Sequence, residues 1–174
     1  MAKNQALQRW DVEDSAELYG IRTWGAGFFD VSDKGEVVIC PQGAGGPRVS
    51  IMEVIAGLRD RGYDMPVLLR IENILSARIA DIHEAFSEAF RKLGYKGEYR
   101  GVFPIKVNQQ QQVVEKISQF GARYHHGLEV GSKAELIAAV SLMSDTEASI
   151  ICNGYKDEEF IDLGLQAQNR KSVV

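Results

Sequence analysis

Residues 101–108 read Gly101-Val102-Phe103-Pro104-Ile105-Lys106-Val107-Asn108, a short apolar run with a lysine near its end, just before a polar helix start. Lysine is rarely buried without a partner, so a lysine in a strand that enters a core needs a physical reason. One reason is chemical, because a partly desolvated amine can lose its proton and react with a carbonyl cofactor. The alternative is an ordinary lysine that ends its strand and points into water. The stretch by itself leaves both interpretations open.

Apolar runs alternate with amphipathic segments on both sides of this lysine. The pattern predicts strands at 66–71, 99–107, 124–130 and 148–152, each followed by a helix, at 79–93, 109–120, 134–143 and 158–168. Regular βα alternation with short connections predicts an α/β fold with a parallel sheet, either doubly wound or closed as a barrel. A complete (β/α)8 barrel needs at least about 200 residues. Four βα units therefore predict the first half of such a barrel, with open edges on its first and fourth strands.

The region before residue 49 has a different pattern. A loose arm with a short helix near Asp11–Tyr19 precedes two β-rich runs, 21–31 and 36–41, which flank the turn Ser32-Asp33-Lys34-Gly35. Such runs predict a β-hairpin, which needs a larger sheet to be stable. The glycine-rich segment 42–48 lacks the Gly-Lys-Ser/Thr of a phosphate-binding loop and is interpreted as a connector. We therefore expect an arm and hairpin at 1–48 and a partial barrel at 49–168.

Two helix starts in the predicted barrel carry the pattern of a capping box. Ser50 is followed three residues later by Glu53, and Ser132 by Glu135. In a capping box the serine side chain and the acidic side chain each satisfy a backbone N–H of the first helical turn.

Composition excludes several classes of protein. The chain has 174 residues, a formal charge of −4 and 45% hydrophobic residues, which is typical of a globular domain. It lacks an apolar run of about 18 residues and a secretory leader, so we expect a cytoplasmic protein without a membrane partner. Slight acidity without a basic stripe argues against nucleic-acid binding. Cys40 and Cys152 have no metal or redox spacing and are interpreted as small hydrophobes in a reducing compartment.

Several polar residues fall where predicted strands end, which is where barrels carry their chemistry. Lys106, Glu129 and the turn from Asn153 to Lys156 all lie at such ends. The alternatives are a salt-bridge or cap partner for Glu129 and a surface lysine for Lys156. His125 and His126 are neighbours in a predicted strand and would face opposite sides, which argues against a shared metal. We expect one of them in a core or interface, and no metal site.

The residues around Lys106 match a known pattern. Phe103-Pro104-x-Lys106-Val107-Asn108, followed by Val113-Val114, Ile117 and Gly121, resembles the pyridoxal-phosphate attachment segment of the ornithine/diaminopimelate/arginine decarboxylase family, fold type III. The stretches 24–29, 127–136 and 151–157 favour the arginine-specific members of that family. The resemblance extends over roughly residues 18 to 166.

The resemblance implies roles for individual residues. Lys106 matches the lysine that covalently holds pyridoxal 5′-phosphate, and Glu129 matches an acidic residue beside that cofactor. Glu135 matches a second acid near the site. The implied activity is decarboxylation of L-arginine to agmatine and CO2 in polyamine (putrescine and spermidine) biosynthesis, with Mg²⁺ as an accessory ion and a dimer-based homo-oligomer. The resemblance also assigns the hairpin to a separate β-domain, which C-terminal strands complete.

The chain also departs from the family pattern. Arginine-type members are several times longer, and the segments without a counterpart here include the phosphate-binding loops and the acid that pairs with the pyridine nitrogen. Residues 169–174 do not resemble a continuation of the barrel. We therefore expect an N-terminal fragment, truncated or frameshifted, that is inactive alone. Two alternatives stay open: decarboxylation of ornithine, lysine or diaminopimelate, and a non-catalytic chain that binds a full-length subunit.

Overall fold

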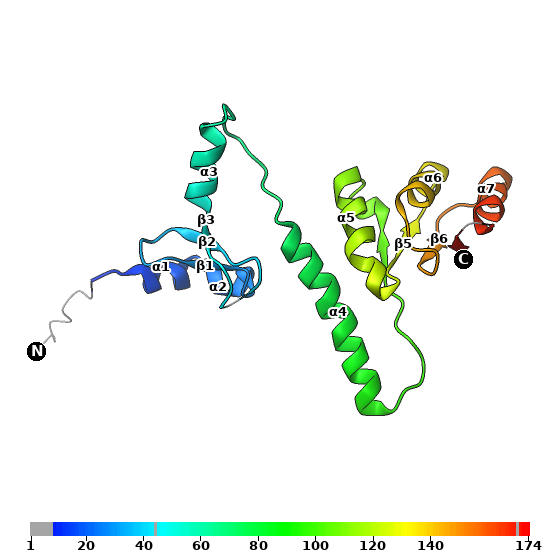
Figure 1. The fold of residues 1–174 in the computed structure, drawn as a ribbon, viewed down its shortest axis with the longest axis horizontal. Helices are drawn as coiled ribbons and strands as arrows, with labels where there is room; N and C mark the ends of the chain where they lie inside the picture. Colours follow the sequence, from blue (N-terminus) through cyan, green and yellow to red (C-terminus); the bar gives the residue numbers. More distant parts are fainter. Residues whose placement is uncertain (1–8, 44, 170) are drawn as a thin grey trace, which may run out of the picture. The chain divides into compact units, whose positions relative to one another are not determined.

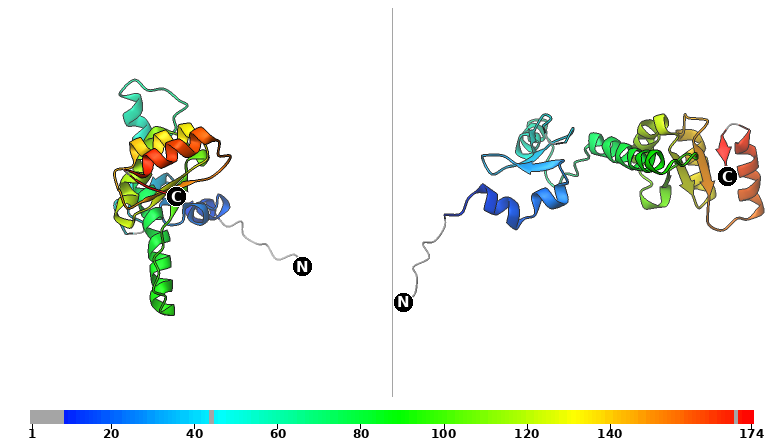
Figure 2. Two further views of the ribbon diagram at one scale, coloured as in Figure 1. Left: turned by 90° about the vertical axis from the view of Figure 1, so that its right-hand side faces the viewer. Right: turned by 90° about the horizontal axis from the view of Figure 1, so that it is seen from below.

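The structure, a computed structural model, describes residues 9–43, 45–169 and 171–174. The chain divides into two compact units, one ending at Ile74 and one starting at Leu75, and each has its own sheet (Figure 1; Figure 2). We expected a boundary near residue 48. The first unit extends further because helix α3 (Ile51–Arg59) packs on the N-terminal strands. Within the described ranges, no helix is both long and apolar enough to cross a membrane.

The first unit is a small antiparallel sheet with short helices. Its elements are α1 (Val12–Leu18), α2 (Ile21–Gly25), β1 (Phe29–Val31), β2 (Val37–Ile39) and β3 (Val49–Ser50). β1 pairs with β2 so that Phe29 lies opposite Ile39, and β2 pairs in turn with β3. α1 starts at Asp11, whose carboxylate accepts a hydrogen bond from the Asp14 N–H while the Asp14 carboxylate accepts one from the Asp11 N–H. The expected hairpin is thus present as a narrower pair within a three-stranded sheet.

The start of the first β-rich run is helical rather than extended. Ile21–Gly25 forms α2, and left-handed residues bracket it, Gly20 at φ 61° and Ala26 at φ 47°. A left-handed residue reverses the local chain direction and so interrupts an extended strand. The prediction of a strand from residue 21 was therefore wrong for residues 21–28, and only Phe29–Val31 of this run form a strand.

The predicted strand at 66–71 was also wrong. These residues form neither helix nor strand, they belong to neither sheet, and Leu68 is 74% exposed. An apolar run becomes a buried parallel strand only where neighbouring strands hydrogen-bond to it and helices cover its faces. Apolar composition alone did not reveal that this segment lacks a place in the sheet.

The second unit has the predicted alternation of strands and helices. Its elements are α4 (Glu72–Leu93, which begins three residues before the boundary), β4 (Val102–Pro104), the 3-10 turn η1 (Ile105–Val107), α5 (Gln111–Gly121), η2 (Ala122–Tyr124), β5 (Gly127–Val130), α6 (Lys133–Leu142), β6 (Ser149–Cys152), α7 (Glu158–Gln168) and β7 (Ser172–Val173). All four strands are parallel, in the order β4-β5-β6-β7. The predicted parallel α/β sheet is confirmed.

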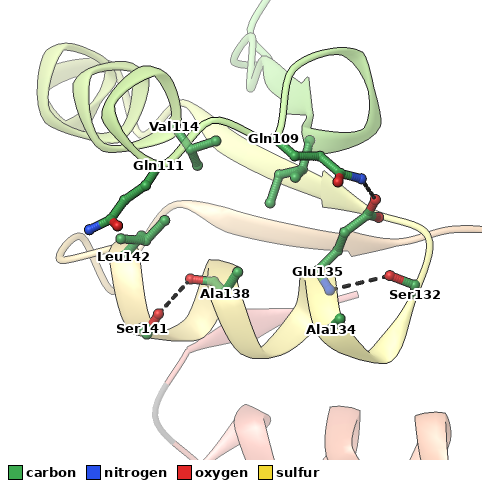
Figure 3. A pocket seen from close by; sticks show the side chains of 10 residues that line it. Gln109, Gln111, Val114, Ser132, Ala134, Glu135, Ala138, Ser141 and Leu142 are labelled. Atoms are coloured by element: carbon green, nitrogen blue, oxygen red, sulfur yellow. Dashed lines mark hydrogen bonds between the residues drawn. The ribbon is translucent and has the colours of Figure 1, made fainter.

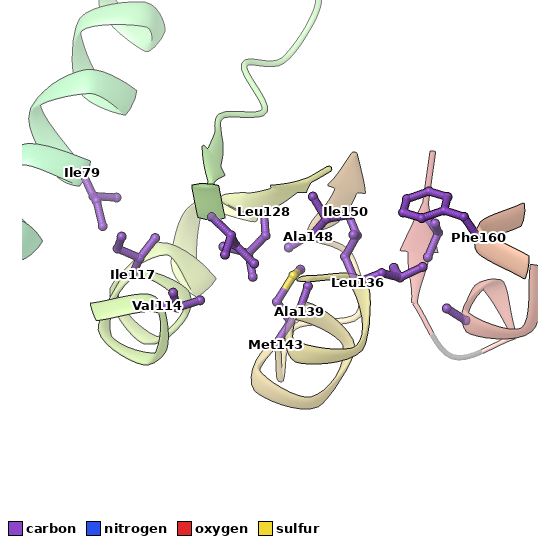
Figure 4. Packing of buried hydrophobic residues seen from close by; sticks show 14 residues of the cluster. Ile79, Val114, Ile117, Leu128, Leu136, Ala139, Met143, Ala148, Ile150 and Phe160 are labelled. Atoms are coloured by element: carbon purple, nitrogen blue, oxygen red, sulfur yellow. The ribbon is translucent and has the colours of Figure 1, made fainter. Parts of the chain in front are cut away.

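The core of this unit lies between the sheet and its helices (Figure 4). Leu128 and Val130 of β5 are fully buried against Leu136 of α6 and Val114 of α5. Because side chains alternate along a strand, Glu129 between them points to the opposite face of the sheet. Strand alternation therefore separates the packed face from a face that is free to carry polar groups.

The end of the chain differs from expectation. Ser172–Val173 forms β7, whose Val173 is 8% exposed and lies beside Ile150 in the register. Two further hydrogen bonds extend the pairing, from the Cys152 N–H to the Val174 carbonyl and from the Val174 N–H to the Ile150 carbonyl. The expected non-barrel tail thus contains a fourth parallel strand.

The adjacent histidines lie before β5 rather than within it. His125 has a left-handed backbone, with φ 52°, and its Nδ1 lies 2.9 Å from an Asp145 carboxylate oxygen. His126 Nδ1 lies 2.9 Å from Nε2 of His83, which comes from α4 and is buried. The side chains thus take separate partners, as expected, although the strand that was to separate them does not reach this far. In the part of the chain that the structure describes, no group of three or more His, Cys, Asp or Glu side chains is arranged to hold a metal.

Candidate functional site

Lys106 lies just beyond the carboxyl end of β4. The strand ends at Pro104, and η1 follows, closed by a hydrogen bond of 3.0 Å from the Asn108 N–H to the Ile105 carbonyl. Ile105 is 3% exposed and anchors this turn in the core, whereas the Lys106 side chain is 59% exposed. The prediction that the strand continues to residue 107 was wrong. As a result, the amine lies in solvent at the carboxyl end of the sheet instead of within it.

Glu129, at the carboxyl half of the neighbouring strand β5, meets this amine. Lys106 Nζ lies 3.2 Å from Glu129 Oε1, and Asn153 Nδ2 donates to the same oxygen at 3.0 Å. The Glu129 side chain is only 14% exposed. The hydrogen bond from Asn153, followed by that from Lys106, lowers the pKa of Glu129 below its usual value. The carboxylate is therefore charged at neutral pH and pairs with the lysine.

Asn153 follows the third strand, β6, and is fixed by its own hydrogen bonds. Its N–H donates to the Val130 carbonyl at 2.7 Å, and its side-chain oxygen accepts from the Gly154 N–H at 2.7 Å. The second bond assigns the oxygen to Gly154, so the NH2 group faces Glu129. Gly154 has φ +76°, and a Cβ there would lie 2.8 Å from the Gly131 carbonyl oxygen. The loops after β5 and β6 therefore touch, and only glycine fits at their contact.

Glu135 occupies a different environment from the lysine. Its Oε1 accepts from Gln109 Nε2 at 2.7 Å (Figure 3). Its Oε2 accepts from the Gly131 N–H at 2.6 Å. Among the hydrogen bonds of the described residues, those of its carboxylate go to Gln109 and Gly131 and not to Lys106 or Glu129. Its position next to a cofactor stays a prediction.

The first turn of α6 is capped in a different way from the expected box. Ser132 Oγ accepts from the Glu135 N–H at 3.3 Å, as predicted, but the Glu135 carboxylate bonds to the Gly131 N–H instead of that of Ser132. At the earlier helix, Ser50 Oγ accepts from the Met52 N–H. Each serine caps its helix without the full reciprocal pair.

A pocket of about 470 Å³ lies between α5 and α6 (Figure 3). Glu135 and Gln109 line one end, and Gln111, Ser141 and Leu142 line the other.

Lys156 lies in the loop after β6, where its Nζ is 3.4 Å from the Gly154 carbonyl oxygen. Of the sequence-predicted groups, the structure thus brings together Lys106, Glu129 and Asn153.

Sequence reasoning placed the turn 153–156 at a strand end but did not single out Asn153. The available signal was its position, because β6 lies beside β5 and its first following residue reaches the same edge. Which polar residue of the turn would contact Glu129 depends on the turn geometry, which the sequence does not state.

Comparison with known proteins identifies the family. The pyridoxal binding domain of the pyridoxal-dependent decarboxylases matches residues 77–174. The chain belongs to this decarboxylase family. The match includes Lys106, Glu129 and Asn153, and it runs through β7.

Relatives of this chain share one description. The biosynthetic arginine decarboxylase of Gloeobacter violaceus is 46% identical over 162 residues, which are 93% of this chain and 25% of the relative. That of Prochlorococcus marinus MIT 9303 is 44% identical over 173 residues, 98% of this chain and 27% of the relative. The crystal structure of biosynthetic arginine decarboxylase SpeA from Campylobacter jejuni superposes with a TM-score of 0.81 at 36% identity, over 89% of this chain and 26% of that one. The chain spans about a quarter of the length of these relatives.

The site residues fit the pyridoxal cofactor of the family. Attachment requires a primary amine that is open to the aldehyde, and Lys106 supplies an amine at an exposed strand edge. The neighbouring Glu129 carboxylate accepts a hydrogen bond from this amine. The described residues thus place an exposed primary amine beside an acid, an arrangement that fits the attachment of this cofactor.

Proposed function

We propose that this chain is the cofactor-attachment part of a pyridoxal-phosphate-dependent arginine decarboxylase, which releases agmatine and CO2 and serves polyamine biosynthesis. The observation that carries the proposal is the contact of 3.2 Å between Lys106 Nζ and Glu129 Oε1 at the carboxyl edge of a parallel sheet, inside the stretch that matches the pyridoxal binding domain. The substrate follows from the relatives, which are named as arginine decarboxylases.

The residues of this chain would do three things. Lys106 would hold the cofactor through its side-chain amine. Glu129 accepts the hydrogen bond of that amine and balances its charge while it is protonated. Glu135 is assigned as a second acid near the site. Pyridoxal phosphate, when bound, supplies the electron sink for the electron pair that remains after CO2 leaves.

The sheet supports the first half of a (β/α)8 barrel as the scaffold. Its four strands follow one another without a reversal of order, and βα crossovers are almost always right-handed, which places the connecting helices on one face. Open doubly wound sheets reverse their order at a switch point. We further propose that the antiparallel sheet of the first unit belongs to a separate β-domain.

Three further assignments complete the proposal. A dimer-based homo-oligomer and Mg²⁺ as an accessory ion rest on the resemblance to the family, and a cytoplasmic location rests on the composition of the sequence. Each stays a prediction.

Cofactor attachment is tested directly on the chain. We expect incubation with pyridoxal 5′-phosphate followed by borohydride to fix one pyridoxyl group, which peptide mass mapping should locate on Lys106. Lys106→Arg should abolish this labelling, while Lys156→Arg, at an exposed loop lysine, should leave it unchanged. Equal labelling of several lysines, or none at Lys106, would contradict the proposal.

The reaction is tested by transplantation. The chain replaces the aligned 162-residue segment of the Gloeobacter violaceus relative, and agmatine release from arginine is measured. We expect turnover that Lys106→Ala removes. A chimera that folds and takes up pyridoxal phosphate but releases no agmatine would rule out the arginine decarboxylase assignment.

A further inference from the structure

The Glu129 carboxylate is held from two sides, and only one of them belongs to the reacting group. Lys106 comes from the end of β4, whereas Asn153 comes from the end of β6, two strands away in the sheet. Both donate to the same oxygen, Oε1, so the position of that oxygen depends on both. Asn153 is therefore placed to determine where the carboxylate lies when the lysine reacts.

The amide of Asn153 cannot turn freely. Its oxygen accepts from the Gly154 N–H at 2.7 Å, and its backbone N–H donates to the Val130 carbonyl of β5 at 2.7 Å. Gly154 in turn contacts the backbone of Gly131, which follows β5. The donor that faces Glu129 is thus fixed by the backbone of the same strand that carries Glu129.

We propose that Asn153 is a positioning residue, which orients the Glu129 carboxylate toward the Lys106 amine. The inference rests on the proposed function, because it assigns Asn153 a role in the attachment of the pyridoxal cofactor to Lys106. A flexible glutamate beside a half-exposed lysine would sample several rotamers, and a surface ion pair loses much of its value to that entropy. An amide anchored on backbone groups removes this freedom without adding charge.

Two substitutions separate positioning from a role in the turn. Asn153→Asp keeps an oxygen that can accept from the Gly154 N–H but removes the donor to Glu129. Asn153→Ala removes both bonds. Asn73→Asp, at an exposed asparagine of α4, changes the net charge equally and serves as the control.

The first measurement needs no cofactor. Carboxyl ¹³C NMR follows the titration of Glu129, whose pKa we expect to rise in Asn153→Asp and Asn153→Ala and to stay unchanged in Asn73→Asp. A rise in the alanine variant with no change in the aspartate variant would show that Asn153 acts only through the turn, and would overturn the proposal. No change in either variant would overturn it as well.

The second measurement links the position of Glu129 to the reactivity of the amine. We expect Asn153→Ala to increase the rate of pyridoxal phosphate labelling at Lys106 at pH 7.5 by about two- to fivefold, since a poorly oriented carboxylate forms a weaker ion pair with the amine and leaves it freer to react. In a Glu129→Gln background the same substitution should have no further effect. An unchanged rate in a wild type that labels at Lys106 would overturn the positioning role and leave the proposed function intact.

Failure of the proposed function has a different signature. If the wild-type chain is not labelled at Lys106, the attachment role fails, while the Glu129 titration still decides whether Asn153 orients the carboxylate.

Discussion

At the scale of single residues, the candidate site depends on the alternation of side chains along β5. Leu128 and Val130 are fully buried among the helices, and Glu129 between them faces the other side of the sheet. The hydrophobic face thus fixes the register of the strand, and the register places the acid. Because packing already fixes the position of residue 129, its chemistry depends only on which amino acid stands there.

Glu129→Gln should make the lysine more reactive. The amide keeps the shape of the side chain but removes the negative charge that lies 3.2 Å from Lys106 Nζ. The amine then loses the carboxylate that holds it in an ion pair, so we expect pyridoxal phosphate to label Lys106 up to about fivefold faster at pH 7.5, the range for an exposed ion pair. Mass spectrometry after borohydride reduction measures the rate, with Glu115→Gln on the exposed face of α5 as the control. A slower rate would mean that Glu129 activates the amine instead of stabilising its charge.

At the scale of elements, the loops after β5 and β6 position the site because their backbones touch. Gly154 has a left-handed conformation that a side chain disfavours, and it packs on the Gly131 carbonyl. Gly164 in the helix α7 is the opposite case, since a Cβ there would meet nothing within 4 Å. Replacement by alanine is therefore expected to have opposite effects on the free energy of unfolding at these two glycines.

Gly154→Ala should destabilise the protein by about 1–3 kcal/mol, because it combines left-handed strain with a close contact. Gly164→Ala should stabilise it by about 0.5–1 kcal/mol, because alanine is the better helix former. Urea unfolding followed by circular dichroism gives both free energies of unfolding. Equal effects of the two substitutions would mean that the contact between the loops does not constrain the native state.

The helices were largely predictable from sequence, and α7 has the predicted bounds. Its N-cap residue is Asp157, whose carboxylate accepts a hydrogen bond from the Phe160 N–H. Such a cap involves only residues that are close in sequence, so it can be predicted from the sequence. The segment 66–71 and the short helix Ile21–Gly25 were not predictable in the same way. Whether an apolar run finds strands to pair with is a tertiary property. The contact of Asn153 with Glu129 and that of His83 with His126 join residues 24 and 43 positions apart, which no local pattern encodes.

At the scale of the second unit as a whole, a histidine pair, with His83 buried and His126 half-buried, joins α4 to the start of β5. His83 stacks on Tyr124 with ring centroids 4.5 Å apart, and Tyr99 contacts it edge-on at 4.9 Å. Burial, followed by the charge on His83, lowers the pKa of His126 to about 4, and burial lowers the pKa of His83. Both rings are therefore neutral in the native state at neutral pH.

Stability should fall as the pH drops from 7 to 5. His126 in the unfolded chain binds a proton near pH 6.5, whereas in the folded chain it does so only near pH 4, so the unfolded state binds more protons in this window. We expect a loss of about 1–2 kcal/mol between pH 7 and pH 5, above the range in which most carboxyl groups titrate. Urea midpoints at the two pH values measure it, and His126→Asn should flatten the dependence. A stability that is the same at both pH values in the wild type would contradict a histidine pair that is neutral in the folded state.

The pairing of β7 with β6 makes the reactivity of the Cys152 thiol a measure of how often this end of the sheet opens. Cys152 is half-buried at the end of β6, its N–H donates to the Val174 carbonyl, and burial raises the pKa of its thiol. A half-buried thiol with a raised pKa alkylates slowly in the folded protein. Because the backbone N–H of Cys152 bonds to the Val174 carbonyl, we expect its alkylation to become faster when β7 leaves the sheet, and the buried Cys40 supplies a comparison in the other unit. The alkylation rates of the two cysteines thus show which of the two units opens first.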